Sequence, residues 1–435
     1  MLRRAATRIA AHLAGGPLTS GVRAFAANLA YLSGSDLLAS LITFWFSAWA
    51  IRVMGPAEFG VASLVISAAQ LAMIPMLFGL HASTSRAVAA TRTPGPVMSS
   101  ALLLTGLLIP AVALLGAVFA GAIAGLTGLS RLMVFASLPL AAALVLQTVL
   151  QGMMAGLQRF REFSRFNILS AIVYAALMAA GLASGATWVV WLYVALTGLR
   201  SLVLAIFCLA HVRSGLRRPT REAARTLAHF GGVYTVGSVA NFFALGALDS
   251  LMLNAWHGAA AAGLYAAYLA AFNIIMSRVI KLLTDVLIPV ATAHGEPRRI
   301  AQRAVRGLLG PAWVIVPATM LLARFLFLMY GDAYAFSWRT AALLGLCIYL
   351  QVGVGVSAAL MVAGGLESLR IASSVAVLTA IINVGGNFLL IPPYAVDGSL
   401  IATAASSAIG LTLRIAWLLR SDSARSAVTA GKHSS

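Results

Sequence analysis

Charged side chains occur inside long apolar stretches of this sequence, where charge is rare. Three acids and five bases fall there, namely Asp36, Asp249 and Asp285 with Arg200, Arg278, Lys281, Arg324 and Arg414. A charge in an apolar medium normally faces a polar cavity or pairs with an opposite charge. The surplus of bases favours contact with an anionic group, and the planar fork of arginine suits phosphate.

The densest group of charges is in the stretch "SRVIKLLTD". Arg278, Lys281 and Asp285 are spaced i, i+3 and i+7, which places them on one face of a helix. These side chains could line a binding cavity. Alternatively, Lys281 could pair with Asp285, and Arg278 with Asp249 or Asp36, so that the charges only hold helices together. Both interpretations can be true of one cavity wall.

The remaining charges are candidates for two roles. Arg200 and Arg414 are further candidates for a cavity that binds substrate. Asp36 and Asp249 could either join helices or bind a coupling ion, and for Asp249 we favour the structural role. Arg324 lies near the end of its apolar stretch, from which a long side chain can reach the membrane surface.

The composition determines which elements must position these residues. Of 435 residues, 61% are hydrophobic and only 9% are charged, against about 25% charged residues in soluble domains. The apolar runs are about 20–28 residues long, as membrane-spanning helices require, and not the roughly 10-residue alternating segments of a barrel. The sequence therefore predicts an all-α polytopic membrane protein.

We count about twelve spans, and the distribution of positive charge supports this number. The predicted spans are 28–50, 59–81, 98–122, 132–155, 166–187, 189–210, 231–255, 262–290, 308–330, 341–363, 371–391 and 399–419. If the N-terminus is cytoplasmic, 22 of the 30 Lys and Arg residues lie in cytoplasmic segments and only three lie in the opposite loops. Cytoplasmic loops are rich in such residues, so we expect both termini in the cytoplasm.

Several function classes find no support in the sequence. Cys208 and Cys347 lie in apolar runs, and the seven histidines form no HExxH motif. No segment is long enough for a soluble catalytic domain, and the bases are spread over seven short segments, which is unlike a nucleic-acid-binding surface. The sequence therefore predicts no enzyme, no cofactor, no metal site and no nucleic-acid partner; the lipid bilayer is the expected surrounding.

The two halves of the chain resemble each other. Gly60 aligns with Gly263, and Arg200 in "LTGLR" has its counterpart in Arg414 in "GLTLR". Parallel repeats of this kind are typical of transporters with a central site between two halves. The expected division is a cytoplasmic segment 1–27, a six-helix bundle 28–210, a basic linker 211–230, a second six-helix bundle 231–420 and a disordered tail 421–435.

The string "RVMGPAEFG" separates the first two spans. Gly55 can take a positive φ at a helix end, Pro56 suits the first turn of the next helix, and Glu58 suits its positive end. These residues predict a tight helical hairpin, but hairpin chemistry alone does not account for Arg52 or Gly60.

The same string resembles the start of the Wzx-type polysaccharide-export flippases of the multidrug/oligosaccharidyl-lipid/polysaccharide (MOP) superfamily. Arg52, Gly55, Pro56 and Gly60 match that pattern as a hairpin signature, and Met54 replaces its leucine. Other similar stretches follow in order over nearly the whole chain, namely "GLQRFREFSRFNIL", "ALDSLMLNAWHGAAAAGLYAAYLAA", "YGDAY" and "NVGGNFLLIPPYAVDGSLIATAAS". The stretch "PPYAVDG" departs from the pattern, since relatives have a glycine nearer the tyrosine, and this could alter the packing of the last hairpin.

The resemblance implies a flippase that moves an oligosaccharide linked to polyprenyl pyrophosphate across a bacterial inner membrane, by alternating access and for polysaccharide synthesis. A polysaccharide polymerase or export machinery would be a further partner. An ion-coupled multidrug antiporter of the same superfamily is the alternative, although acidic and not basic residues would be expected at the floor of its cavity. A membrane assembly protein without transport is a third class, against which the charges within spans argue.

Overall fold

The fold is all-helical, as the composition predicts. The computed structural model describes residues 20–432 except 186, 245, 274–311 and 364–365, and within these ranges it contains no strand. The long helices are α2 (Ser20–Leu77), α4 (Pro94–Val118), α6 (Arg131–Gly156), α7 (Phe160–Ala183), α8 (Val189–Val212), α9 (Arg221–Ala244), α13 (Ala312–Tyr330), α14 (Trp338–Ala363) and α15 (Leu366–Lys432). Shorter helices are α3 (Leu80–Ala90), α5 (Ala120–Thr127), α10 (Ala247–His257) and the helix Ala259–Asn273.

Two of the long helices are hairpins. The helix α2 turns at Gly55, where φ is 69° and ψ is 174°. The helix α15 turns at Ala395, where φ is 47° and ψ is −123°. Each therefore supplies two spans, one on either limb, and we call the end of the molecule at which α2 turns the hairpin end.

The number of membrane crossings agrees with the sequence. Eight apolar helices in the described residues are long enough to cross a membrane, and two of them are the hairpins just described. A further span consists of α9 and α10, which are interrupted at Gly246 with φ of 91°. The apolar helix Ala259–Asn273 overlaps the start of the predicted span 262–290, the rest of which lies outside the described residues. The prediction of an all-α polytopic membrane protein is confirmed, and the described helices are consistent with about twelve spans.

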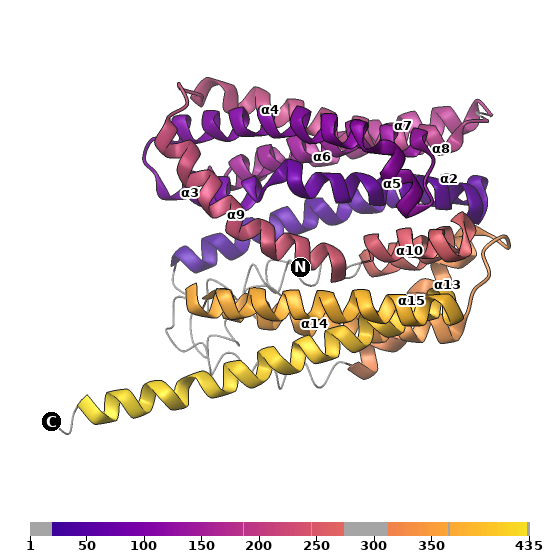
Figure 1. Ribbon diagram of the computed structural model, residues 1–435. Coiled ribbons are helices and arrows are strands. Elements are labelled where there is room, and N and C mark those ends of the chain that lie inside the picture. Colours follow the sequence, from indigo (N-terminus) through magenta and orange to yellow (C-terminus); the bar gives the residue numbers. More distant parts are fainter. Residues whose placement is uncertain (1–19, 186, 245, 274–311, 364–365, 433–435) are drawn as a thin grey trace.

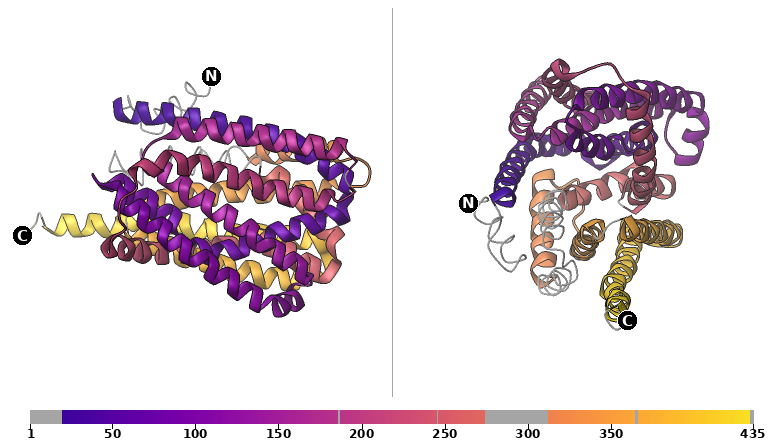
Figure 2. Two further views of the ribbon diagram at one scale, coloured as in Figure 1. Left: turned by 90° about the horizontal axis from the view of Figure 1, so that it is seen from above. Right: turned by 90° about the vertical axis from the view of Figure 1, so that its left-hand side faces the viewer.

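The helices form two bundles. The elements α2, α4, α6, α7 and α8 pack together and lie in the upper part of Figure 1, whereas α13, α14 and α15 pack together below them. The helix α9 runs between the groups and contacts both α3 and α15. The end-on view in Figure 2 shows the two groups side by side. The helical segment of α15 continues to Lys432, into the tail for which the sequence predicts disorder.

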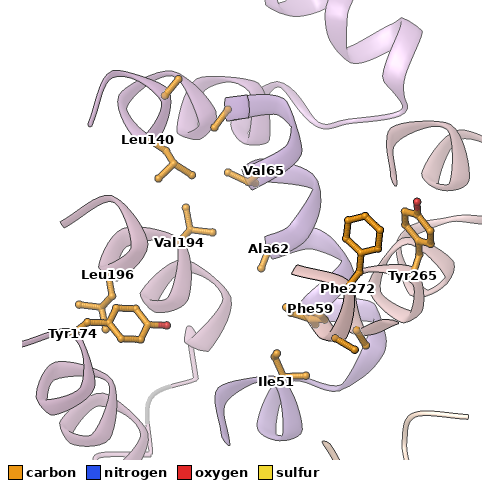
Figure 3. Close-up of a cluster of buried hydrophobic side chains, with 14 of the residues drawn as sticks. Ile51, Phe59, Ala62, Val65, Leu140, Tyr174, Val194, Leu196, Tyr265 and Phe272 are labelled. Carbon is orange, nitrogen blue, oxygen red and sulfur yellow. The ribbon is translucent and has the colours of Figure 1, made fainter. Parts of the chain in front are cut away.

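One cluster of buried apolar side chains reaches across both bundles and includes residues near the hairpin end. Phe59 of α2 is 5% exposed, and Tyr265 of the helix Ala259–Asn273 is 1% exposed. Figure 3 shows Ile51 and Phe59 close to Phe272 from the other bundle, with Tyr174 farther away on α7. Large apolar side chains on α4 remain exposed, among them Leu107 and Leu114, as expected of a surface that faces lipid. The core therefore holds the first bundle against the second where α2 turns.

Candidate functional site: a polar cavity

A cavity of about 540 Å³ lies among α2, α6, α7, α8, α10 and the helix Ala259–Asn273. We call it the central cavity. Both limbs of α2 line it, from Ser40 to Ile51 on the first limb and from Phe59 to Gln70 on the second. Its size is within the usual range of ligand pockets, about 300–1,000 Å³. The helices that surround it come from both halves of the chain.

The wall of the central cavity is unusually polar for an apolar protein. The lining residues with polar side chains are Ser40, Thr43, Ser47, Ser63, Ser67, Gln70, Gln147, Tyr174, Tyr193, Thr197, Arg200, Ser201, Ser250 and Asn273. Arg200 is the one charged side chain among the described residues that line it. The hydroxyls of Ser47 and Tyr174 are 2.9 Å apart and hydrogen-bonded. Such a wall can offer hydrogen bonds in many directions and a single positive charge.

Arg200 is joined to a chain of hydrogen bonds in the first bundle. Its Nη2 atom donates to Oδ1 of Asn167 over 3.2 Å. The other end of the same amide, Nδ2 of Asn167, donates to Oδ1 of Asp36 over 2.8 Å. Asn167 and Asp36 are each 8% exposed. The structure therefore brings together Asp36 and Arg200, which the sequence places in different spans, through a residue that the sequence analysis did not select.

Contacts between the bundles lie beyond the cavity at the hairpin end. Gly60 is so close to Ala259 that a Cβ atom on Gly60 would overlap the carbonyl of Ala259. The Tyr334 hydroxyl donates to the carbonyl oxygen of Ile51 over 3.1 Å. A Cβ atom on Gly331 would lie 3.5 Å from Nε of Arg52. These contacts join the two bundles at the hairpin end.

The hairpin signature therefore has a second role besides turning the chain. Gly55 takes the left-handed φ, and no atom of the described residues lies within 4 Å of a Cβ placed on it. The carbonyl of Pro56, by contrast, lies directly against Gly263 of the other bundle. Arg52, Pro56 and Gly60 thus contact the second bundle, while Gly55 serves the turn.

Asp249 lies in a buried polar network of the second bundle. Its carboxylate is 0% exposed and accepts hydrogen bonds from Asn387 (2.7 Å), Tyr265 (2.8 Å), Ser399 (2.9 Å) and Thr403 (3.4 Å). These donors come from the helix Ala259–Asn273 and from both limbs of α15. Asp249 therefore lies at a junction of four helical segments, and its four hydrogen-bond donors in the described residues are uncharged.

The other charged candidates lie away from the described wall of the cavity. Arg414 is 4% exposed on the second limb of α15, and its Nε atom has no hydrogen-bond partner in the described part of the chain. Arg324 is exposed on α13, with its guanidinium carbon 5.2 Å from the ring centroid of Phe336. Arg278, Lys281 and Asp285 lie outside the described residues, so their roles stay predictions.

The sequence contained a signal for the polar wall that charge alone does not reveal. Ser40, Thr43 and Ser47 are spaced i, i+3 and i+7 on the first limb of α2. A similar series, at i, i+4 and i+7, follows on the second limb with Ser63, Ser67 and Gln70. This spacing places each series on one helix face. Two polar faces on one apolar hairpin indicate a shared cavity.

Comparison with known proteins gives consistent results. The family described as "Polysaccharide biosynthesis protein" matches residues 25–293. A curated relative, the "Probable low-salt glycan biosynthesis flippase Agl15" of Haloferax volcanii, is 23% identical over 411 residues, covering 92% of this chain and 83% of the relative.

The fold is also similar to solved transporter structures. One is an inward-facing conformation of a multidrug resistance MATE family transporter of the MOP superfamily, with a TM-score of 0.68, 14% identity and coverage of 87% of this chain and 95% of the other. Another is a MOP superfamily transporter from Pyrococcus furiosus, described as having a binding pocket of reverse polarity, with a TM-score of 0.64, 14% identity and coverage of 92% of this chain and 99% of the other.

Proposed function

We propose that this chain, which belongs to the family described as "Polysaccharide biosynthesis protein" and shares its fold with MOP superfamily transporters, is a membrane transporter that flips a lipid-linked oligosaccharide. The substrate would be an oligosaccharide on polyprenyl pyrophosphate, moved from the cytoplasmic to the outer leaflet. The relative in Haloferax volcanii is named as a probable glycan biosynthesis flippase, which supports this substrate class.

The observation that carries the proposal is the chemistry of the central cavity. Its hydroxyl and amide groups can donate hydrogen bonds to sugar hydroxyls and accept hydrogen bonds from them. These bonds would replace the hydrogen bonds to water that the sugar gives up when it crosses roughly 30 Å of hydrocarbon. Arg200 supplies a cation for the pyrophosphate. The described wall contains no carboxylate, which suits an anionic substrate better than an organic cation. The polyprenyl chain can stay in the surrounding lipid.

The direction of transport rests on the orientation of the chain. We infer that the hairpin end faces outward and that both termini are cytoplasmic in a bacterial inner membrane, because the short loops at the hairpin end hold few bases. Alternating access would then open and close the contacts of Gly60, Tyr334 and Arg52 with the opposite bundle. A reporter fused after Ser435 that is active only outside the cell would overturn this orientation.

Coupling and partners are parts of the same proposal. We assign residues 28–210 and 231–420 to the two moving bundles and 211–230 to their linker. Asp249 serves the structure of the second bundle through its four donors. Asp36 acts on Arg200 through Asn167. A polymerase or export complex would take the flipped product.

Reconstitution tests the proposed substrate. Liposomes containing the purified protein receive a polyprenyl-pyrophosphate-linked trisaccharide, and flipping is measured as loss of its accessibility to a membrane-impermeant oxidant. We expect faster loss than in protein-free liposomes, and slower loss with Arg200→Gln. Arg324→Gln is the matched control, because its guanidinium lies on Phe336 at the exposed surface. Active export of ethidium without any flipping would instead establish the alternative, a multidrug antiporter.

A further inference from the structure

The side-chain amide of Asn167 connects a group that needs a hydrogen-bond donor, Asp36, with a group that needs an acceptor, Arg200. The carboxylate of Asp36 can only accept hydrogen bonds when ionised, and the guanidinium of Arg200 can only donate them. The observed contacts, Nδ2 to Asp36 at 2.8 Å and Oδ1 from Arg200 at 3.2 Å, satisfy both requirements at once. A rotation of this amide by half a turn would place its NH₂ group against the guanidinium and its oxygen against the carboxylate. The orientation of Asn167 is therefore fixed from both sides.

The position of Asn167 connects this fixed amide to the cavity. Asn167 lies on α7, Arg200 lies on α8 and Asp36 lies on the first limb of α2. Asn167 itself is buried and is not part of the described cavity wall, whereas Arg200 is part of it. A long arginine side chain has many rotamers, and fixing one of them before a ligand arrives lowers the cost of binding.

We propose that Asn167 is a positioning residue, which holds the guanidinium of Arg200 at the cavity wall, where it can meet a pyrophosphate group, through an oxygen that carries no charge. A carboxylate at the same place would also hold Arg200, but it would form an ion pair and compete with the ligand. This inference rests on the proposed function for the identity of the anion. It adds that the neutral character of residue 167 sets the affinity for that anion.

Three variants separate positioning from mere stability. Asn167→Asp puts a carboxylate against Arg200 and leaves two acceptors facing each other at Asp36. The exchange Asp36→Asn with Asn167→Asp restores a donor and an acceptor at that contact and keeps the net charge of the cluster. Arg200→Gln removes the cation. The exchange variant is the decisive one, because it can restore packing without restoring a neutral partner for Arg200.

The first measurement is binding of inorganic pyrophosphate to the purified full-length protein. Binding is detected as a rise in the melting temperature of the protein with pyrophosphate concentration. We expect the exchange variant to reach wild-type abundance while its dissociation constant for pyrophosphate rises about ten- to a hundredfold, the range for losing a hydrogen bond to a charged group. Adding Asn167→Asp to Arg200→Gln should then raise the constant no further. The inference would be overturned by any of three outcomes. These are wild-type affinity in the exchange variant, an equal loss of affinity from Asn167→Asp whether residue 200 is arginine or glutamine, and no binding of pyrophosphate by the wild-type protein.

The second measurement is flipping of the lipid-linked trisaccharide by the same variants. We expect the exchange variant to raise the half-saturating substrate concentration by a similar factor and to change the maximal rate by less than about twofold, because the defect is in anion capture. A fall in maximal rate at unchanged half-saturation would contradict a positioning role. Pyrophosphate binding that depends on Asn167, in a protein that flips no glycolipid, would overturn the proposed function and leave the positioning role in place.

Discussion

Gly60 and Gly263 lie against each other where the two bundles meet: a Cβ atom on Gly263 would be 2.7 Å from the Gly60 nitrogen and 3.0 Å from its Cα. These glycines occupy corresponding positions in the two halves of the sequence. Only residues without a side chain allow two helices to approach so closely. A contact of backbone with backbone also contains no interlocking side chains, which would suit the alternating access that we propose.

We expect Gly60→Ala to lower the thermal stability of the purified protein. The added methyl group would overlap the Ala259 carbonyl, and such overpacking typically costs about 1–3 kcal/mol. The melting temperature in detergent measures the effect. Gly106→Ala is the control, since a Cβ there would meet nothing within 4 Å in the part of the chain that the structure describes and alanine favours a helix. Equal melting temperatures for the two variants would show that the bundles do not need this close contact.

Asp249→Asn should lower the amount of folded protein in the membrane more than it lowers transport per molecule. The new amide would place a donor among Asn387, Tyr265 and Ser399, which all donate to the carboxylate. Loss of hydrogen bonds to a charged group typically costs about 1.5–3 kcal/mol each. Tyr265→Phe, which removes one donor, should have a smaller effect. Normal abundance with abolished transport would favour an ion-coupling role for Asp249.

Ala395→Gly should raise the melting temperature. Ala395 has φ of 47° and ψ of −123° at the turn of α15, a conformation that favours glycine and costs other residues about 1–3 kcal/mol. It lies in "PPYAVDG", the stretch that departs from the pattern which the rest of the sequence resembles. The control is Tyr394→Gly, which should be destabilising because it adds backbone freedom where the helix continues. A lower melting temperature for Ala395→Gly would mean that this turn adopts another conformation.

Arg414→Met should leave the melting temperature unchanged or raise it. The Arg414 side chain is buried, and its Nε atom finds no partner among the described residues. An unsatisfied buried donor costs about 1–3 kcal/mol, which a methionine would remove while keeping much of the volume. Transport measured on the same variant tells whether the guanidinium meets the substrate in another conformation. A loss of several degrees would reveal a stabilising partner for Arg414.

The membrane fold could be read from the sequence because it depends on local composition. A span needs about 20 apolar residues, and its length and charge are properties of one continuous segment. The turn at Gly55 is similarly local, since positive φ favours glycine and Pro56 suits the start of a helix. The sequence also indicated which charges lie inside spans, because each is visible against its apolar neighbours.

Which of these charges meet was decided by tertiary structure. Asp36, Asn167 and Arg200 are far apart in the chain, and their hydrogen bonds exist only because α2, α7 and α8 pack together. Neutral Asn167 gave no signal of its own, since an isolated amide in a span resembles many others that only join helices. Gly60 and Gly263 could be aligned from the repeat, but alignment says only that they are equivalent. Their contact follows from the packing of two bundles, which no single helix encodes.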